Sequence, residues 1–257
     1  MNKHTILFAA IALSTLSASA ADFLKDGTTT VGAGVIVAPQ YSGAKDYRAF
    51  PALFADYQAS NGFFASTYRG LGYMGKADAL SYSASVSYDA GRYDKKENVF
   101  SGSDDLKGMG RIKGAALANL GAGYDLGLAK VDFTAHMALT GRERGNTYEG
   151  GVNVPFSSSA SDQVSFRGAA TYGDRKNVQT FYGVTAAQAA ASGYKAYTAK
   201  GGFESVAASV NWNHVIDAHW SVRTVAGLSH LVGDAAKSPL VKKTTAPILM
   251  STVNYTF

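Results

Sequence analysis

The sequence of 257 residues lacks cysteine altogether and contains only 5 prolines and 17% charged residues. Without cysteine there are no disulfide bonds, thiolate metal sites or cysteine nucleophiles. The low charge is unusual, because an ordinary soluble domain carries about 25% charged residues. Long hydrophobic runs are also missing beyond the first twenty residues, so we expect no transmembrane helix. The net charge of +5 is small and its basic residues are scattered, which argues against a nucleic-acid partner.

Glycine and aromatic residues are abundant instead, with 28 glycines, 15 tyrosines and 13 phenylalanines. So many aromatic residues argue against a disordered chain. The mean hydropathy is nevertheless close to zero, at −0.05. Apolar residues must therefore be interspersed with small and hydroxyl-bearing residues. The order of these residues along the chain is the main evidence for the fold.

The first twenty residues have the pattern of a secretory signal peptide. A basic start at Met1–His4 precedes an apolar run at Thr5–Leu16, and Ala18-Ser19-Ala20 forms an A-x-A cleavage site. We expect residues 1–20 to be removed, which leaves residues 21–257 as a single domain. The alternative, a membrane anchor, fits less well because a spanning helix needs about 20 apolar residues.

Apolar and polar residues alternate with a period of two in the mature chain. The segment 80–89, LSYSASVSYD, alternates apolar residues with serine or aspartate, and the segments 131–139, 205–212 and 220–229 behave similarly. Because successive side chains of a strand point to opposite faces, each segment has one apolar face and one polar or small face.

Two architectures fit this alternation. A soluble sandwich would bury the apolar face between two sheets, whereas a membrane barrel turns it toward lipid and keeps the polar face in the lumen. The segments match the roughly 9 to 11 residues of a tilted membrane strand better than the 5 or 6 of a soluble strand. We therefore predict an all-β, transmembrane, antiparallel up-and-down barrel. Charged or titratable side chains on the polar face need water or partners, which a lumen supplies; they are Asp89, Asp132, His136, Arg167 and Arg223.

The C-terminal segment, ILMSTVNYTF, alternates up to a terminal phenylalanine. Such a strand resembles the signal read by the barrel assembly machinery of the outer membrane. We interpret Val253, Tyr255 and Phe257 as that assembly signal, and we expect the protein in the outer membrane of a Gram-negative bacterium.

The number of strands is less certain than the architecture. The alternation defines eleven segments, at 28–38, 47–57, 61–73, 79–91, 110–125, 127–140, 147–157, 162–173, 198–214, 217–231 and 245–257. Bacterial single-chain barrels have even strand counts. Either 61–73 is two short strands bent at Gly70-Leu71-Gly72, or one segment does not span; we favour twelve strands, with ten as the alternative.

The connections fall into two classes once Phe257 is placed in the periplasm. Short periplasmic turns are expected near 125–128, 157–162 and 213–218, and longer extracellular connections at 92–109, 140–147, 174–197 and 232–244. In the third of these, Thr185 is suited to N-cap a helix over Ala186–Ser192, and Gly193 to end it. We predict this one short helix, packed as a lid or partial plug.

A last connection carries the candidate interaction surface. Asp234 suits an Asx turn and Pro239 fixes its own φ, so the loop should be structured. The surface comprises Asp234, Lys237, Ser238 and Pro239. Lys237, Lys242 and Lys243 give the loop a positive charge, which favours contact with anionic lipopolysaccharide over the capture of a specific ligand.

Motifs for catalysis, metals and nucleotides are missing. Gly32-x-Gly34 lacks the third glycine of a dinucleotide loop, no G-K-[ST] phosphate loop occurs, and the 5 histidines form neither H-x-x-x-H nor H-E-x-x-H. His136 and Asp132, both expected to face inward, are the best candidates for acid–base chemistry, but they lie about 13 Å apart by strand rise and cannot contact each other. We therefore predict no enzyme activity, no cofactor and no metal; a lipid-modifying enzyme is the least favoured function.

Several short motifs, taken in order, resemble those of the MipA/OmpV family. They are VGAGV at 31–35, PQYSG at 39–43, RAFP at 48–51, RGLG at 69–72, YGVT at 182–185, SGY at 192–194, LVGDA at 231–235, SPLV at 238–241 and YTF at 255–257. The resemblance spans nearly the whole mature chain.

The resemblance implies an outer-membrane barrel without an active site. It implies a scaffold that links the lytic transglycosylase MltA to a bifunctional penicillin-binding protein, while OmpV relatives imply roles in osmotic response and adhesion. The residues themselves leave open a second function, a narrow channel or small-solute porin lined by charged side chains such as Arg167 and Arg223.

Overall fold

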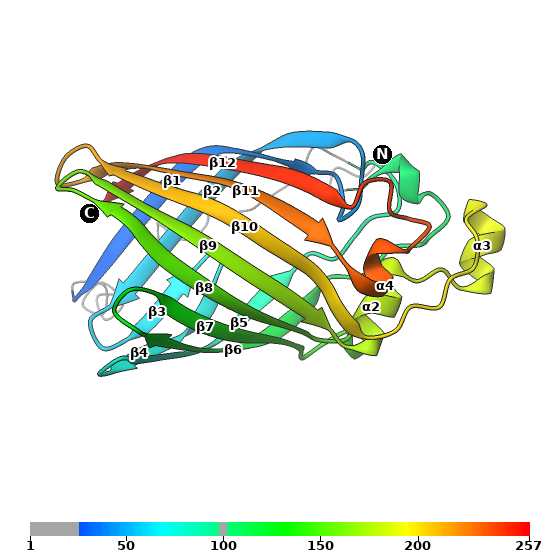
Figure 1. Ribbon diagram of the computed structural model, residues 1–257, viewed down its shortest axis with the longest axis horizontal. Helices are drawn as coiled ribbons and strands as arrows, with labels where there is room; N and C mark the ends of the chain where they lie inside the picture. The colour runs from blue at the N-terminus through cyan, green and yellow to red at the C-terminus, as the bar shows by residue number, and fades with distance from the viewer. Residues whose placement is uncertain (1–25, 98–101) are drawn as a thin grey trace, which may run out of the picture.

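The computed structural model describes residues 26–97 and 102–257, which form a closed barrel of antiparallel strands (Figure 1). Each strand pairs with its neighbours in sequence, and β1 closes the barrel against β12. The predicted barrel and the favoured count of twelve strands are confirmed. The predicted signal peptide lies outside the described residues.

The strands are β1 (Gly27–Pro39), β2 (Tyr47–Ala59), β3 (Phe63–Ser66), β4 (Gly70–Ala77), β5 (Leu80–Asp89), β6 (Ala115–Asp125), β7 (Lys130–Ala138), β8 (Thr147–Ser158), β9 (Asp162–Gly173), β10 (Gly202–Val215), β11 (Trp220–Leu231) and β12 (Thr245–Thr256). The short helices are η1 (Asp104–Leu106), η2 (Arg142–Arg144), α2 (Arg175–Tyr182), α3 (Ala186–Ser192) and α4 (Gly233–Ala236). Over the described ranges, no helix combines the length and hydrophobicity needed to cross a membrane.

The side chains alternate across the barrel wall as the sequence predicts. On β5, the apolar residues face outward and are exposed, whereas the intervening serines are half-buried on the inner face. Large apolar side chains elsewhere on the outside are also exposed, including Leu53, Leu71 and Phe166. An apolar outer band of this kind is what a lipid environment requires.

The segment predicted at 61–73 is two short strands. β3 and β4 are joined by a turn at Thr67–Arg69, just before the predicted bend, and Gly70 opens β4 with φ +80. A positive φ is readily adopted by glycine. β3 pairs only with Asp56–Gln58 of β2. Among the described residues, Tyr47–Phe54 therefore has no strand partner on that side, and we call this edge the notch.

The two ends of the barrel differ in their connections. One end, here the turn end, has the short connections 59–63, 77–80, 125–130, 158–162 and 215–220. The opposite loop end has the connections 39–47, 138–147, 173–202 and 231–245 and the described part of 89–115, and these hold the helices. In Figure 1 the C-terminus lies at the turn end, and α2, α3 and α4 lie at the loop end. The predicted grouping of short and long connections is thus observed.

Helix α3 has the predicted bounds and caps. The Thr185 side chain accepts a hydrogen bond from the Gln188 backbone N–H, and Gly193 ends the helix in the left-handed conformation. The prediction of a single helix is wrong, because α2 and α4 also form. Asp174 N-caps α2 through a 2.8 Å bond from the Asn177 N–H to its Oδ1. Val178, Phe181 and Tyr182 lie on one face of α2, but its eight residues are too few for a stable isolated helix, so α2 depends on packing of this face in the folded protein.

Candidate functional site: a capped polar lumen

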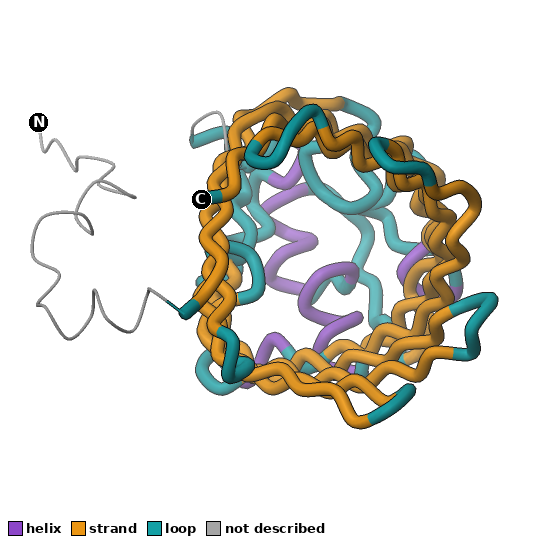
Figure 2. Tube along the Cα trace, turned by 90° about the vertical axis from the view of Figure 1, so that its left-hand side faces the viewer, coloured by secondary structure: helices purple, strands orange, loops and turns teal. Residues whose placement is uncertain are grey.

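Four connections at the loop end pack together into a cap, formed by 39–47, the described part of 89–115, 173–202 and 231–245. One apolar cluster joins all four; it contains Tyr41, Ala44, Leu106, Met109, Val184 and Leu240. A second cluster joins α2 to α4; it contains Val178, Tyr182, Ala199, Leu231 and Ala235. Viewed from the turn end, these helices and loops lie behind the ring of strands (Figure 2).

Hydrogen bonds connect the cap across long sequence separations. The Tyr41 hydroxyl donates to the Leu240 carbonyl at 3.0 Å. The Ser238 hydroxyl donates to the Tyr182 carbonyl at 2.5 Å, and the Tyr182 hydroxyl donates to Ser42 Oγ at 3.1 Å. All five residues belong to the motifs on which the family resemblance rests, so those motifs meet in one structure.

Close packing explains a glycine of the cap and the state of its buried side chains. A Cβ on Gly43 would lie 2.7 Å from Val241 Cγ2, so only glycine fits there without a shift. Burial raises the pKa of Tyr182 to about 12, and the nearby Glu204 carboxylate adds to the effect. Burial lowers the pKa of Arg92 to about 10, and its guanidinium donates to the Phe181 carbonyl. Both groups therefore keep their protons, and their donor roles, at neutral pH.

Beneath the cap lies a cavity of about 810 Å³, here the upper cavity. Its wall is lined by hydroxyl, amide and imidazole side chains of β5, β6 and β7: Ser83, Ser85, Ser87, Asn119, Thr134 and His136. Asn119 Nδ2 donates to Ser85 Oγ at 3.1 Å and to Ser87 Oγ at 2.9 Å. His136 Nδ1 lies 2.8 Å from Asn119 Oδ1. The polar inner face is thus an ordered network.

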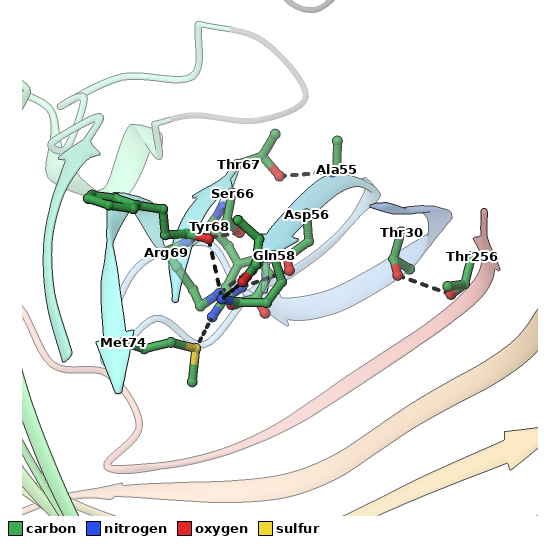
Figure 3. Close-up of polar contacts among 12 residues, drawn as sticks. Thr30, Ala55, Asp56, Gln58, Ser66, Thr67, Tyr68, Arg69, Met74 and Thr256 are labelled. Atoms are coloured by element: carbon green, nitrogen blue, oxygen red, sulfur yellow. Dashed lines mark hydrogen bonds and ion pairs between the residues drawn. The ribbon is translucent and has the colours of Figure 1, made fainter. Parts of the chain in front are cut away.

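Charged residues around the upper cavity are mostly paired. Arg69 Nη2 donates to both carboxylate oxygens of Asp56, at 2.8 and 2.7 Å (Figure 3). The Arg69 guanidinium also stacks over the Phe64 ring, 4.2 Å from its centroid. Arg144 Nη2 donates to Asp89 Oδ1 at 2.6 Å. These pairs leave the polar wall between them almost neutral.

The lumen continues toward the turn end. A second cavity of about 370 Å³ shares Met74, Ser83 and Thr134 with the upper cavity. Here Arg167 donates to Asp132 at 2.6 and 2.9 Å and to Glu149 at 2.7 Å. A third cavity, of about 480 Å³, shares Asn153 with the second and is lined by Arg223. Polar residues therefore line the lumen from the cap to the turn end.

The five predicted lumen residues all line these cavities, and the structure shows which of them meet. Asp132 and Arg167 form an ion pair, whereas His136 and Asp89 bind other partners. The sequence analysis missed Glu149, Arg144 and Glu204. Strand alternation could have placed Glu149 inward. It would have placed Glu204 outward with Val206, and Glu204 lies inward because the register of β10 shifts between Phe203 and Ser205. No sequence signal could have placed Arg144, because it enters the lumen from a connection.

The interaction surface predicted in the last connection is partly buried within the cap. Ser238 is buried, and Asp234 accepts a bond from the Lys200 N–H at 2.9 Å. Lys237 is exposed and lies 3.8 Å from Asp234, and Pro239 is half-buried. Asp234 and Ser238 therefore hold the cap together, and only Lys237 is freely presented.

The C-terminal residues lie on the outer face of the turn end. Val253 and Phe257 are exposed, and the Tyr255 ring packs 4.9 Å from both Trp220 and Phe257. An aromatic group at a barrel rim suits the membrane interface. The role of these residues as an assembly signal stays a prediction.

Across the described residues, no group of three or more histidines and carboxylates is placed to hold a metal ion. His136 and Asp132, the pair considered for acid–base chemistry, are held by different partners. What the lumen can do chemically is present donors and acceptors to a molecule inside it.

Among solved structures, porins are similar to this chain at low sequence identity. The KdgM porin is 10% identical, with 89% of this chain and 99% of that chain covered and a TM-score of 0.48. The NanC porin is also 10% identical, with coverage of 88% and 98% and a TM-score of 0.45. No curated protein matches. The family model described as "MltA-interacting protein MipA" matches residues 31–257, and the chain therefore belongs to the MipA family.

Proposed function

We propose that this barrel is an outer-membrane scaffold that links the membrane to peptidoglycan-remodelling enzymes, namely the lytic transglycosylase MltA and a bifunctional penicillin-binding protein. The observation that carries the proposal is the cap. Because packed loops cover the loop end, the turn end is the surface at which the molecule can act. The family description, which names an MltA-interacting protein, supports the same partner.

The proposal sets the orientation of the barrel. The apolar outer band lies in lipid, the turn end lies in the periplasm and the cap faces outward. Exposed lysines on the cap, Lys237, Lys242 and Lys243, suit contact with anionic lipopolysaccharide. Val253, Tyr255 and Phe257 keep their proposed role as the signal for the barrel assembly machinery.

Apolar side chains at the tips of two turns offer a surface for the enzymes. Leu126 is 59% exposed, Leu128 87% and Ile216 56%. Apolar side chains such as these can form the buried centre of an interface with a partner protein. These turns project from the barrel end where periplasmic enzymes would approach.

Retention of the purified barrel on immobilised MltA and on the penicillin-binding protein tests this proposal. We expect the wild-type barrel to bind, and the double variant Leu128→Asp/Ile216→Asp to bind at least tenfold more weakly. Lys237→Asp, at the opposite end, is the control and should bind normally. The scaffold role would be contradicted if the wild-type barrel were retained by neither enzyme. It would also be contradicted if the double variant and Lys237→Asp lost binding to the same extent.

A narrow channel is the second candidate function. It is favoured by the three lumen cavities, which share lining residues along the barrel. A barrel of this size has a modest lumen that inward side chains can fill. Steady single-channel steps from the wild-type protein in planar bilayers would favour this candidate.

A further inference from the structure

Beyond the scaffold role, we propose that the upper cavity is a binding site for a neutral, hydroxyl-rich small molecule, of the class of a short saccharide. The site is formed by Arg144 and Glu204 beneath the cap and by the polar wall of β5, β6 and β7. The proposal concerns the lumen, and it does not depend on any enzyme bound at the turn end.

Two buried atoms at the top of the cavity lack partners. Arg144 is only 5% exposed; its Nη2 donates to Asp89, but its Nη1 has no hydrogen-bond partner among the described residues. Glu204 Oε2 is likewise buried without a partner in the described part of the chain. Orphaned buried polar atoms are rare because each costs about 1–3 kcal/mol. One orphan is a donor and the other an acceptor, and alcohol hydroxyls can satisfy both kinds.

The wall of the cavity has fixed hydrogen-bonding directions. Ser85 and Ser87 accept from the Asn119 amide, so their own O–H protons are left to donate into the cavity. Asn119 Oδ1 faces His136 Nδ1, so in the neutral ring Nδ1 carries the proton and Nε2 is left as an acceptor. Donors and acceptors thus lie close together on the wall of the cavity. The hydroxyls of a sugar, each of which can donate and accept, can bind to both.

The charge pattern selects against ionic ligands. Arg144 and Arg69 are already paired with carboxylates, so no unpaired cation attracts an anion. Glu204 would repel an anionic ligand, and a cationic ligand attracted to Glu204 would enter a cavity that also holds the Arg144 guanidinium, which repels it. A neutral ligand is repelled by neither side chain.

The size and the aromatic residues of the cavity agree with this class. Ligand pockets usually enclose about 300–1,000 Å³, and the upper cavity encloses about 810 Å³. Phe64, Tyr68 and Phe181 line it beside the polar wall. Aromatic rings pack well against the C–H faces of sugar rings, while the hydroxyls reach the polar wall. Because the cap covers the loop end, the ligand enters through the lumen from the turn end.

Titration calorimetry of the folded barrel in detergent tests the site. The probes are maltose, cellobiose and N,N′-diacetylchitobiose, with sodium glucuronate and glucosamine as charged comparators. We expect saturable binding of at least one neutral disaccharide, and binding at least tenfold weaker for both charged sugars. Ser85→Ala/Ser87→Ala and Glu204→Gln should each weaken neutral binding about tenfold.

Ser81→Ala is the matched control. Ser81 lies on the inner face of the same strand, but it lines the second cavity rather than the upper one, so binding should be unchanged. Near-ultraviolet circular dichroism and unfolding on heating confirm that each variant is folded. Absence of saturable binding by all three neutral disaccharides, tighter binding of a charged sugar, or an equal loss in Ser81→Ala would overturn the proposal. Because MltA is absent, failure here leaves the scaffold test unaffected.

Discussion

Arg167 sets the charge balance in the middle of the lumen. Its guanidinium joins Asp132 on β7 to Glu149 on β8, with three contacts between 2.6 and 2.9 Å. Bidentate contacts of this kind need the planar fork of arginine, which lysine cannot reproduce. Without the guanidinium, two carboxylates on neighbouring strands would face each other unpaired.

Replacing Arg167 should therefore destabilise the barrel. Removing one partner of a fully buried ion pair costs about 3–5 kcal/mol, but these side chains are about one-quarter exposed. We expect Arg167→Gln to lower the free energy of unfolding by about 1–3 kcal/mol, and Arg167→Lys by less, in denaturant titrations. Arg223→Gln is the control, because Arg223 has no ion pair among the described residues. Equal stability of Arg167→Gln and wild type would show that the carboxylates find other partners.

For single residues, the sequence predicts whether a side chain points into the lumen, but it does not predict which other side chain it contacts. Alternation placed Asp132 and Arg167 inward, since side-chain direction has a period of two. Their pairing depends on the register of β7, β8 and β9, in which Arg167 lies opposite Asn153 and Asp132 opposite Gly151. Register is fixed by the whole sheet, and so the ion pair could not be read from separate segments.

At the scale of elements, local signals predicted those structures that are stabilised locally. Helix α3 was predicted because Thr185 and Gly193 cap it within its own sequence. Helix α2 also has a local N-cap, Asp174, and an apolar face with Val178 and Tyr182, but it lacks the left-handed glycine that ends α3, and its apolar side chains find their partners only in the cap. The division of 61–73 was anticipated as one of two options, but the notch beside it depends on how far β3 extends along β2.

The notch should be visible in amide hydrogen exchange. Ala55 donates its N–H to Thr67 Oγ1 and accepts from the Thr67 N–H, so alternate amides of β2 point toward the notch. Pro51 occupies one of these positions, where its missing N–H costs no ladder bond. In detergent, we expect the amides of Ala49 and Leu53 to exchange at least tenfold faster than those of Phe50 and Phe54, which point to β1. Uniform protection along β2 would mean that another segment covers the notch.

At the scale of the whole molecule, the cap depends on contacts between distant parts of the sequence. Tyr41 and Leu240 are 199 residues apart and share a hydrogen bond. The motifs that carry the family resemblance could be recognised one by one, but their convergence follows from barrel closure, which brings all long connections to one end. The cap is therefore a property of the closed barrel, and its effect on passage can be tested separately from barrel formation.

Replacing residues 176–199 with a short Gly-Ser linker should open the lumen without unfolding the barrel. The deletion removes Val178, Tyr182 and Val184 from both cap clusters but leaves every strand pairing intact. In planar bilayers we expect steady conductance steps from this variant and few or none from the wild type, because packed side chains cover the wild-type loop end. Shortening the turn at 126–129, which lies outside the cap, is the control and should leave conductance unchanged. If the wild type conducts as well as the deletion variant, the cap does not close the lumen and the narrow-channel function is the better account.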